Sequence, residues 1–213
     1  MARARWLPLS GIVFVVLGLL AVVVFGGSTP DTDASAAKVA SFYDAHMGRQ
    51  AIAAFLLAAS APFLVLFGVQ LSTALSTAQR SAIWERFLVA GSAVAGATII
   101  FGALTHFALA DAADNGVSGD AIRALNILDT DGWVAFNSGL GVMMLGAGWA
   151  VVAAARLLPR WLGWVAVVVG VLLFIPFADF IALLLTLIWI IVASIMLWRT
   201  HERSVVAATP QTA

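Results

Sequence analysis

Residues 180–198 read FIALLLTLIWIIVASIMLW, and no side chain in this run is charged. Residues 7–27 read LPLSGIVFVVLGLLAVVVFGG and have the same character. An apolar stretch of about 20 residues is long enough to cross the ~30 Å hydrocarbon core of a membrane as a helix. Hydrocarbon offers no partner to a backbone N–H or C=O group, so a stretch inside it must satisfy these groups internally. Both runs therefore predict transmembrane helices.

Four further uncharged windows lie between them, at residues 51–75, 87–110, 133–155 and 161–177. We predict an all-α, polytopic membrane protein with a single six-helix bundle over residues 1–199 and a disordered cytoplasmic tail at 200–213. The fifth and sixth windows are separated by the turn Pro176-Phe177-Ala178-Asp179. Merging them would place Asp179 in the middle of a span, at a cost of at least ~2.5 kcal/mol.

The composition agrees with this class of protein. Hydrophobic residues make up 62% of the chain and charged residues 10%, with a mean hydropathy of +1.04. A soluble domain carries roughly a quarter charged residues. The formal net charge is zero, which argues against a nucleic-acid partner because such proteins show a basic patch. There are no cysteines, which excludes disulfides and thiolate-bound metals.

Charge asymmetry predicts the orientation. If six spans place both termini on one side, eight of the eleven basic residues lie on that side and nine of the eleven acids on the other. Basic residues near span ends mark the cytoplasmic side. We therefore expect a plasma-membrane protein with both termini in the cytoplasm. The eight basic residues are Arg3, Arg5, Arg80, Arg86, Arg156, Arg160, Arg199 and Arg203.

An alternative for the N-terminus is a cleavable signal peptide ending near Ala34-Ser35-Ala36. The apolar run is about 20 residues long, whereas such peptides have an apolar region of about 7–15. The small-residue motif also lies several polar residues beyond the run. We favour a retained first span.

Two segments on the acidic side show helical periodicity. Asp33 or Ser35 can cap a helix that runs through His46, and Ser118 can cap a second one that runs to about residue 128. We expect short amphipathic helices at the outer membrane surface or across the mouth of the bundle. Their apolar stripes are Val39, Phe42, Tyr43 and His46 in the first, and Ile122, Leu125 and Leu128 in the second.

Polar residues converge on the outer third of the predicted bundle. His106 and Asn137 lie about one turn inside their spans, and Asp179 begins the last span. An ionisable residue inside a membrane is a functional candidate by default. The alternative is that these side chains only cross-link helices. The candidate ligand-binding residues are His106, Asn137, Asp179, Tyr43, Asp129 and Asp131.

Other chemistries find little support. His46, His106, Asp129 and Asp131 have ligand atoms, but no spacing matches a metal motif, and haem would need a second histidine inside the bundle. We expect no metal and no other cofactor. Asn137-Ser138-Gly139 resembles an intramembrane serine protease only superficially, because the Gly-x-Ser-Gly pattern and a partner histidine are missing. No catalytic residue is predicted.

Contacts with lipids and with other helices are predicted elsewhere. Arg156, Arg160, Trp161 and Trp164 combine cations and indoles at headgroup depth on the cytoplasmic side. Small residues spaced four apart allow close helix contacts, and one such face could serve a homo-oligomer or a larger membrane assembly. These pairs are Ser92 and Gly96, Ala54 and Ala58, and Gly146 and Ala150.

Two runs, DASAAKVASFYDAHMGR at residues 33–49 and LPRWLGW at 158–164, carry a family resemblance. With the order of the spans and the loop lengths, they resemble a large group of small six-span actinobacterial integral membrane proteins of unknown function. The resemblance implies a plasma-membrane protein and assigns no catalytic or binding residue.

Three hypotheses follow for the function. The first is a non-enzymatic structural or accessory membrane protein, because no catalytic constellation is evident. The second is a small transporter or ligand-binding protein whose outward-facing, acid-rimmed vestibule attracts cations or amines. The third, a membrane enzyme acting on lipids, lacks a paired acid and base or a nucleophile. We favour the first.

Overall fold

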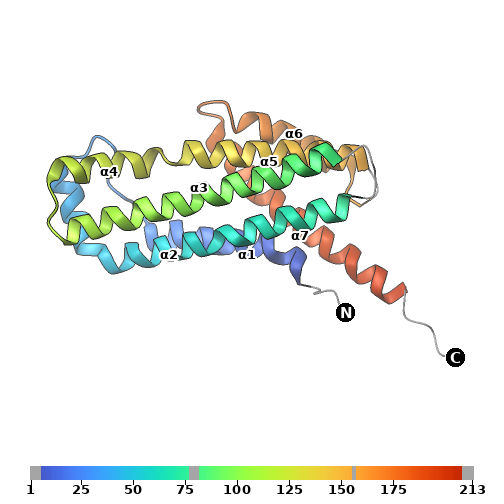
Figure 1. The fold of residues 1–213 in the computed structure, drawn as a ribbon, viewed down its shortest axis with the longest axis horizontal. Coiled ribbons are helices and arrows are strands. Elements are labelled where there is room, and N and C mark those ends of the chain that lie inside the picture. The colour runs from blue at the N-terminus through green and yellow to red at the C-terminus, as the bar shows by residue number, and fades with distance from the viewer. Residues whose placement is uncertain (1–5, 77–81, 155–156, 208–213) are drawn as a thin grey trace.

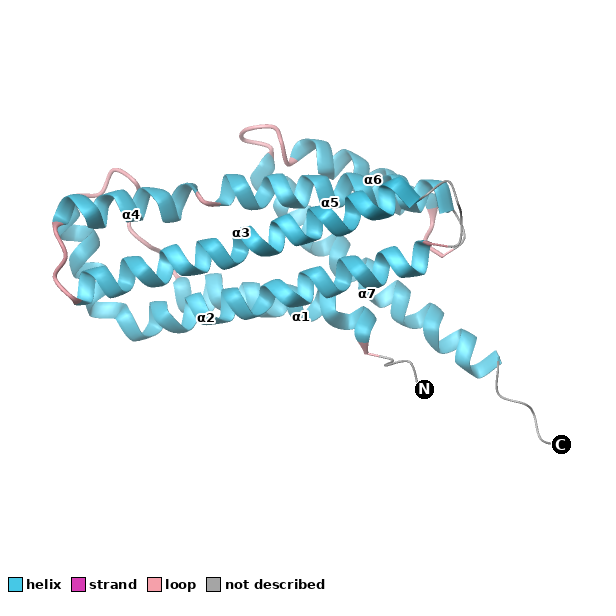
Figure 2. Ribbon diagram, viewed as in Figure 1, coloured by secondary structure: helices cyan, strands magenta, loops and turns pink. Residues whose placement is uncertain are grey.

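The structure is a computed structural model that describes residues 6–76, 82–154 and 157–207. Every regular element in these ranges is helical, which confirms the all-α fold class (Figure 2). In chain order they are η1 (Leu7–Leu9), α1 (Ser10–Leu19), the π-helix η2 (Leu20–Gly26), α2 (Ala36–Leu75), α3 (Ala82–Asp114), α4 (Gly119–Asp131), α5 (Trp133–Ala154), α6 (Arg160–Leu172) and α7 (Asp179–Ala207).

Length and apolar composition suit most of these helices to a membrane. Within the described ranges, five helical segments are long and apolar enough to cross one: Leu7–Gly26, Ala36–Leu75, Ala82–Asp114, Gly119–Ala154 and Asp179–Thr200. The sixth predicted span corresponds to α6, which is apolar but only 13 residues long.

The helices form a closed ring in which neighbours in sequence are neighbours in space. Around the ring, α1 contacts α2, α2 contacts α3, α3 contacts α5, α5 contacts α6, and α6 contacts α7. The ring closes because α7 also contacts α1. Figure 1 shows both chain ends at one end of the long axis, which we call the termini end, and α4 at the opposite end. Side chains such as Leu64, Phe67, Met143 and Ile190 fill the centre of the ring and are fully buried.

Two helices are much longer than a membrane core is thick. The 40 residues of α2 span about 60 Å and the 33 residues of α3 about 50 Å, against a hydrocarbon core of ~30 Å. Their far ends pack with α4 into what we call the head, made of residues 34–50, 107–114 and 119–131. The head has its own apolar cluster, formed by Ala34, Val39, Tyr43, Leu109, Ala110, Ala113 and Ile122.

The head confirms one of the two predicted short helices, since α4 is a separate helix of 13 residues, and corrects the other. The predicted cap is present, since the Ser35 hydroxyl accepts a hydrogen bond from the Lys38 N–H at 3.4 Å. However, the helix does not end at His46 but continues without a break to Leu75. In α4, Ile122 is buried as expected, whereas Leu128 is 45% exposed, and the other buried position is Asn126, one turn after Ile122.

The boundaries of the last two helices also differ from the prediction. The helix α6 ends at Leu172 rather than at residue 177, because Pro176 would clash with the Leu172 carbonyl in a continued helix. Asp179 begins α7, as predicted. This helix extends to Ala207, so the first part of the predicted disordered tail is helical, while residues 208–213 lie outside the described ranges.

Glycines allow α3 and α5 to approach closely. A Cβ atom at Gly91 would overlap the backbone of Met143, and one at Gly146 would overlap the backbone of Leu88. Such contacts are typical of helix pairs that rely on close packing rather than on the hydrophobic effect. Gly146 belongs to one of the predicted small-residue pairs, and its partner Ala150 is fully buried.

Candidate functional site

Three polar side chains from three helices meet where the head joins the bundle. His106 of α3 contacts the Asp129 Oδ2 atom of α4 through Nδ1, at 2.8 Å, and the Gln50 Oε1 atom of α2 through Nε2, also at 2.8 Å. We call Gln50, His106 and Asp129 the neck network. Sequence reasoning selected His106 and Asp129 but missed Gln50, which directly precedes the second apolar window.

The hydrogen bonds of Gln50 determine which atoms donate. Its Nε2 atom donates to the Gly26 carbonyl at 3.0 Å, so its Oε1 atom faces His106 and the His106 Nε2 atom must carry a hydrogen. The other ring nitrogen faces a carboxylate oxygen. The network is therefore complete when one further proton lies between Nδ1 and Oδ2, on either the imidazole or the carboxyl group.

The neck network also reaches the end of the first span. The last carbonyls of a helix have no partner within the helix. Arg49 donates to the Phe25 carbonyl at 2.6 Å and to the Val24 carbonyl at 3.0 Å, beside the bond from Gln50 to Gly26. A cation at a helix C-terminus is also favoured by the helix dipole. Side chains of α2 thus cap η2, and four helical segments are joined here.

Tyr43 lies directly above the network. Its ring is fully buried and meets the His106 ring edge to face, with centroids 5.8 Å apart. It lies two turns before the apolar window of α2, within the head. Burial raises the pKa of its hydroxyl, with the negative charge of Asp129 adding to the increase and nearby Thr29 opposing it. The hydroxyl makes no hydrogen bond of good geometry to Thr29 or any other described residue.

Asn137 and Asp179 form a second polar group between α5 and α7. The Asn137 Nδ2 atom donates to the Asp179 Oδ2 atom at 3.2 Å, and the two residues are 2% and 5% exposed. The predicted outer layer therefore divides into the neck network with Tyr43, the Asn137–Asp179 pair, and Asp131, which is exposed to solvent. No described hydrogen bond connects the first two.

Aromatic residues gather at the termini end. Trp149 of α5 stacks on Trp84 of α3, with centroids 5.8 Å apart, and meets Trp164 of α6 edge to face at 5.4 Å. Trp161 and Arg160 are exposed beside them. Arg156, the other predicted lipid contact, lies outside the described residues. Such a layer of indoles is typical of a membrane–water interface.

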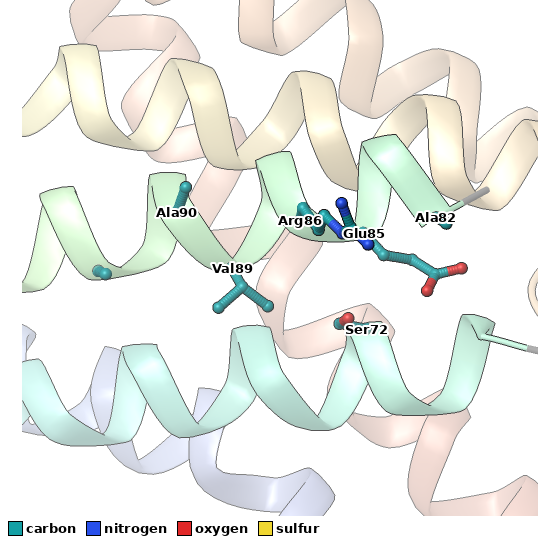
Figure 3. Close-up of a pocket in the computed structure, with 7 residues that line it drawn as sticks. Ser72, Ala82, Glu85, Arg86, Val89 and Ala90 are labelled. Atoms are coloured by element: carbon teal, nitrogen blue, oxygen red, sulfur yellow. The ribbon is translucent and has the colours of Figure 1, made fainter.

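A cavity of about 510 Å³ lies between α2 and α3 near the termini end (Figure 3). The Glu85 side chain is buried there and is not without an interaction partner. The neighbouring Arg86 is exposed. Ser72, on the α2 side, is about 33 Å from Gln50 along the helix. The cavity is thus remote from the neck network. It is lined by Ser72, Ala82, Glu85, Arg86, Val89, Ala90 and Ala93.

Within the described ranges, no three His, Asp or Glu side chains come together in a way that could hold a metal ion. No protein-family model, curated protein or solved structure matches the chain. The resemblance to six-span actinobacterial proteins therefore stays a prediction.

Proposed function

We propose that this chain is a multi-pass integral membrane protein with a non-enzymatic, structural or accessory role. The surface of the bundle supports a membrane location. Ile100, Phe101 and Leu104 are 53%, 51% and 61% exposed on consecutive turns near the middle of α3. Contiguous apolar patches of this kind are rare on soluble monomers, whereas lipid covers them without cost. The side with the head would face outward, and the termini end would face the cytoplasm.

The observation that carries the structural role is the bonding of His106. Both of its ring nitrogens already have partners on other helices, so a ligand would have to break a native hydrogen bond to reach either one. In the second polar group, the Asn137 Nδ2 atom donates to Asp179, whereas the buried Asn137 Oδ1 atom has no described hydrogen-bond partner. This arrangement favours cross-linking of helices over an outward vestibule lined jointly by His106 and Asn137.

Thermal unfolding of the detergent-purified protein tests the choice. We expect no increase in the Tm of the wild-type protein with sodium, potassium, calcium or spermidine, since a ligand that binds only the folded state must raise it. A saturable increase that His106→Gln abolishes without lowering the Tm of the unliganded protein would instead establish the transporter or ligand-binding alternative.

A further inference from the structure

The turn between α6 and α7, residues 173–178, presents the most exposed aromatic side chain among the described residues. Phe177 is 97% exposed, and its φ of 69° lies in the left-handed region that bulky residues rarely adopt. Phe174, Ile175 and Phe180 around it are 49%, 44% and 66% exposed. An apolar patch of this kind needs a covering.

The backbone of this turn is suited to an apolar environment. Most of its N–H groups donate to carbonyl oxygens three or four residues earlier, Pro176 has no N–H group, and the Phe177 N–H makes no described backbone bond. No residue from 165 to 178 has a polar side chain. An irregular segment can enter hydrocarbon only if its polar groups are satisfied internally. The internal donors are the N–H groups of Leu173, Phe174, Ile175, Ala178 and Asp179.

The Asn137–Asp179 bond fixes the depth of the turn. Asn137 lies four residues, about 6 Å, inside α5 from Trp133, whose indole is 45% exposed at the start of that helix. Exposed tryptophans of this kind mark the membrane interface. Phe177 precedes Asp179 by two residues and so lies near the same level. In Figure 1 the turn ends well short of α4 and the head.

The length of α6 also indicates that the turn lies below the membrane surface. Its 13 residues rise about 20 Å from the layer of tryptophans at the termini end, less than the ~30 Å of a hydrocarbon core. The α6 arm of the hairpin is therefore too short by itself to cross the hydrocarbon core. The carboxylate of Asp179, directly after the turn, is buried and points toward Asn137 rather than outward.

We propose that the α6–α7 turn is inserted into the outer leaflet and that Phe177 lies among phospholipid acyl chains as a lipid-binding anchor. This inference rests on the proposed membrane location. Under this proposal, the turn contacts lipid rather than water or a second protein. The α6–α7 hairpin then ends beneath the headgroups, whereas α2, α3 and α4 continue beyond them.

Spin labelling of single cysteines tests the proposal directly, because the natural chain contains no cysteine. Phe177→Cys is labelled with a nitroxide in the full-length protein in phosphatidylcholine vesicles, and its collisions with oxygen and with a water-soluble nickel chelate are measured. We expect frequent collisions with oxygen and few with nickel. Phe174→Cys should behave in the same way and provides the test if Phe177→Cys does not fold.

Two control positions separate the possible failures. Ile100→Cys, in the middle of α3, should favour oxygen, and Asp120→Cys, in the head, should favour nickel. If Ile100→Cys favours nickel, the membrane location itself is wrong. If Ile100→Cys behaves as expected but the turn favours nickel, the turn lies in water. If the turn is shielded from both reagents, a protein surface such as a second copy covers it, and the lipid proposal is equally overturned.

Discussion

The imidazole side chains of His106 and His46 differ in whether they bond to other helices. His106 bonds to two other helices, whereas the Nδ1 atom of His46 bonds to the Phe42 carbonyl of its own helix at 2.7 Å. We predict that His106→Ala lowers the free energy of unfolding by about 1–3 kcal/mol, because Asp129 and Gln50 each lose a partner in a partly buried place. His46→Ala should change it by less than about 1 kcal/mol. Reversible unfolding in mixed micelles measures both, and equal effects would contradict the cross-linking role.

A similar comparison applies to the bond between α5 and α7. Asn137→Leu removes the described partner of the buried Asp179 carboxylate, and we expect a loss of about 2–3 kcal/mol. Replacing both residues with leucine should recover part of the loss, since no polar group is then left unpaired. Ser138→Ala is the matched control, because Ser138 is exposed and bonds only to Val134 of its own helix. A double leucine variant that is less stable than Asn137→Leu would refute this explanation.

The sequence predicted how deep in the bundle many of the candidate residues lie, but not which helix face or which side of the bundle they occupy. Counting residues from the span ends placed His106 one turn inside its span, with Tyr43 and Asp129 close above it, and these three do lie together. Asp131 follows Asp129 by two residues, or about 200° around a helix, so only one of the two can face the bundle. Asn137 has the depth of His106 but lies in another sector of the ring. Depth follows from hydropathy, whereas the sector depends on how the helices pack.

At the scale of elements, the chain predicted where apolar segments lie better than where helices end. The predicted outer helix ran through His46 and the second span began at residue 51, yet α2 passes through the residues between them unbroken. A change from apolar to polar residues marks the membrane surface, and a helix can continue across that surface into water. The early end of α6 was predictable in principle, because Pro176 excludes the helical conformation for the turn before it.

The close approach of α3 to α5 gives a prediction at this scale. Gly91→Ala should disrupt the pairing, because the added methyl group meets backbone atoms of Met143 that cannot rotate away. Overpacking of this kind costs about 1–3 kcal/mol or more. Gly102→Ala in the same helix has open space around it and should stabilise the protein by about 0.5–1 kcal/mol through helix propensity. Thermal unfolding of the two variants measures the contrast, and a Tm for Gly91→Ala at or above that of the wild type would contradict the packing.

At the scale of the whole molecule, the closed ring and the shared end for both termini agree with an even number of passes. If the termini end faces the cytoplasm, as we propose, the arginines near it follow the cytoplasmic preference of basic residues. The sequence did not predict that α2 continues beyond its apolar window into a head, because hydropathy marks the apolar segment and not the end of the helix.

Labelling of single cysteines in intact cells tests the central claim most directly. Asp120→Cys in the head, Ala2→Cys and Ala213→Cys are exposed in turn to a membrane-impermeant maleimide before and after the membrane is opened. The account predicts that Asp120→Cys reacts in intact cells and that the two terminal cysteines react only after opening. Reaction of one terminal cysteine but not the other in intact cells, or protection of Asp120→Cys until the membrane is opened, would contradict it.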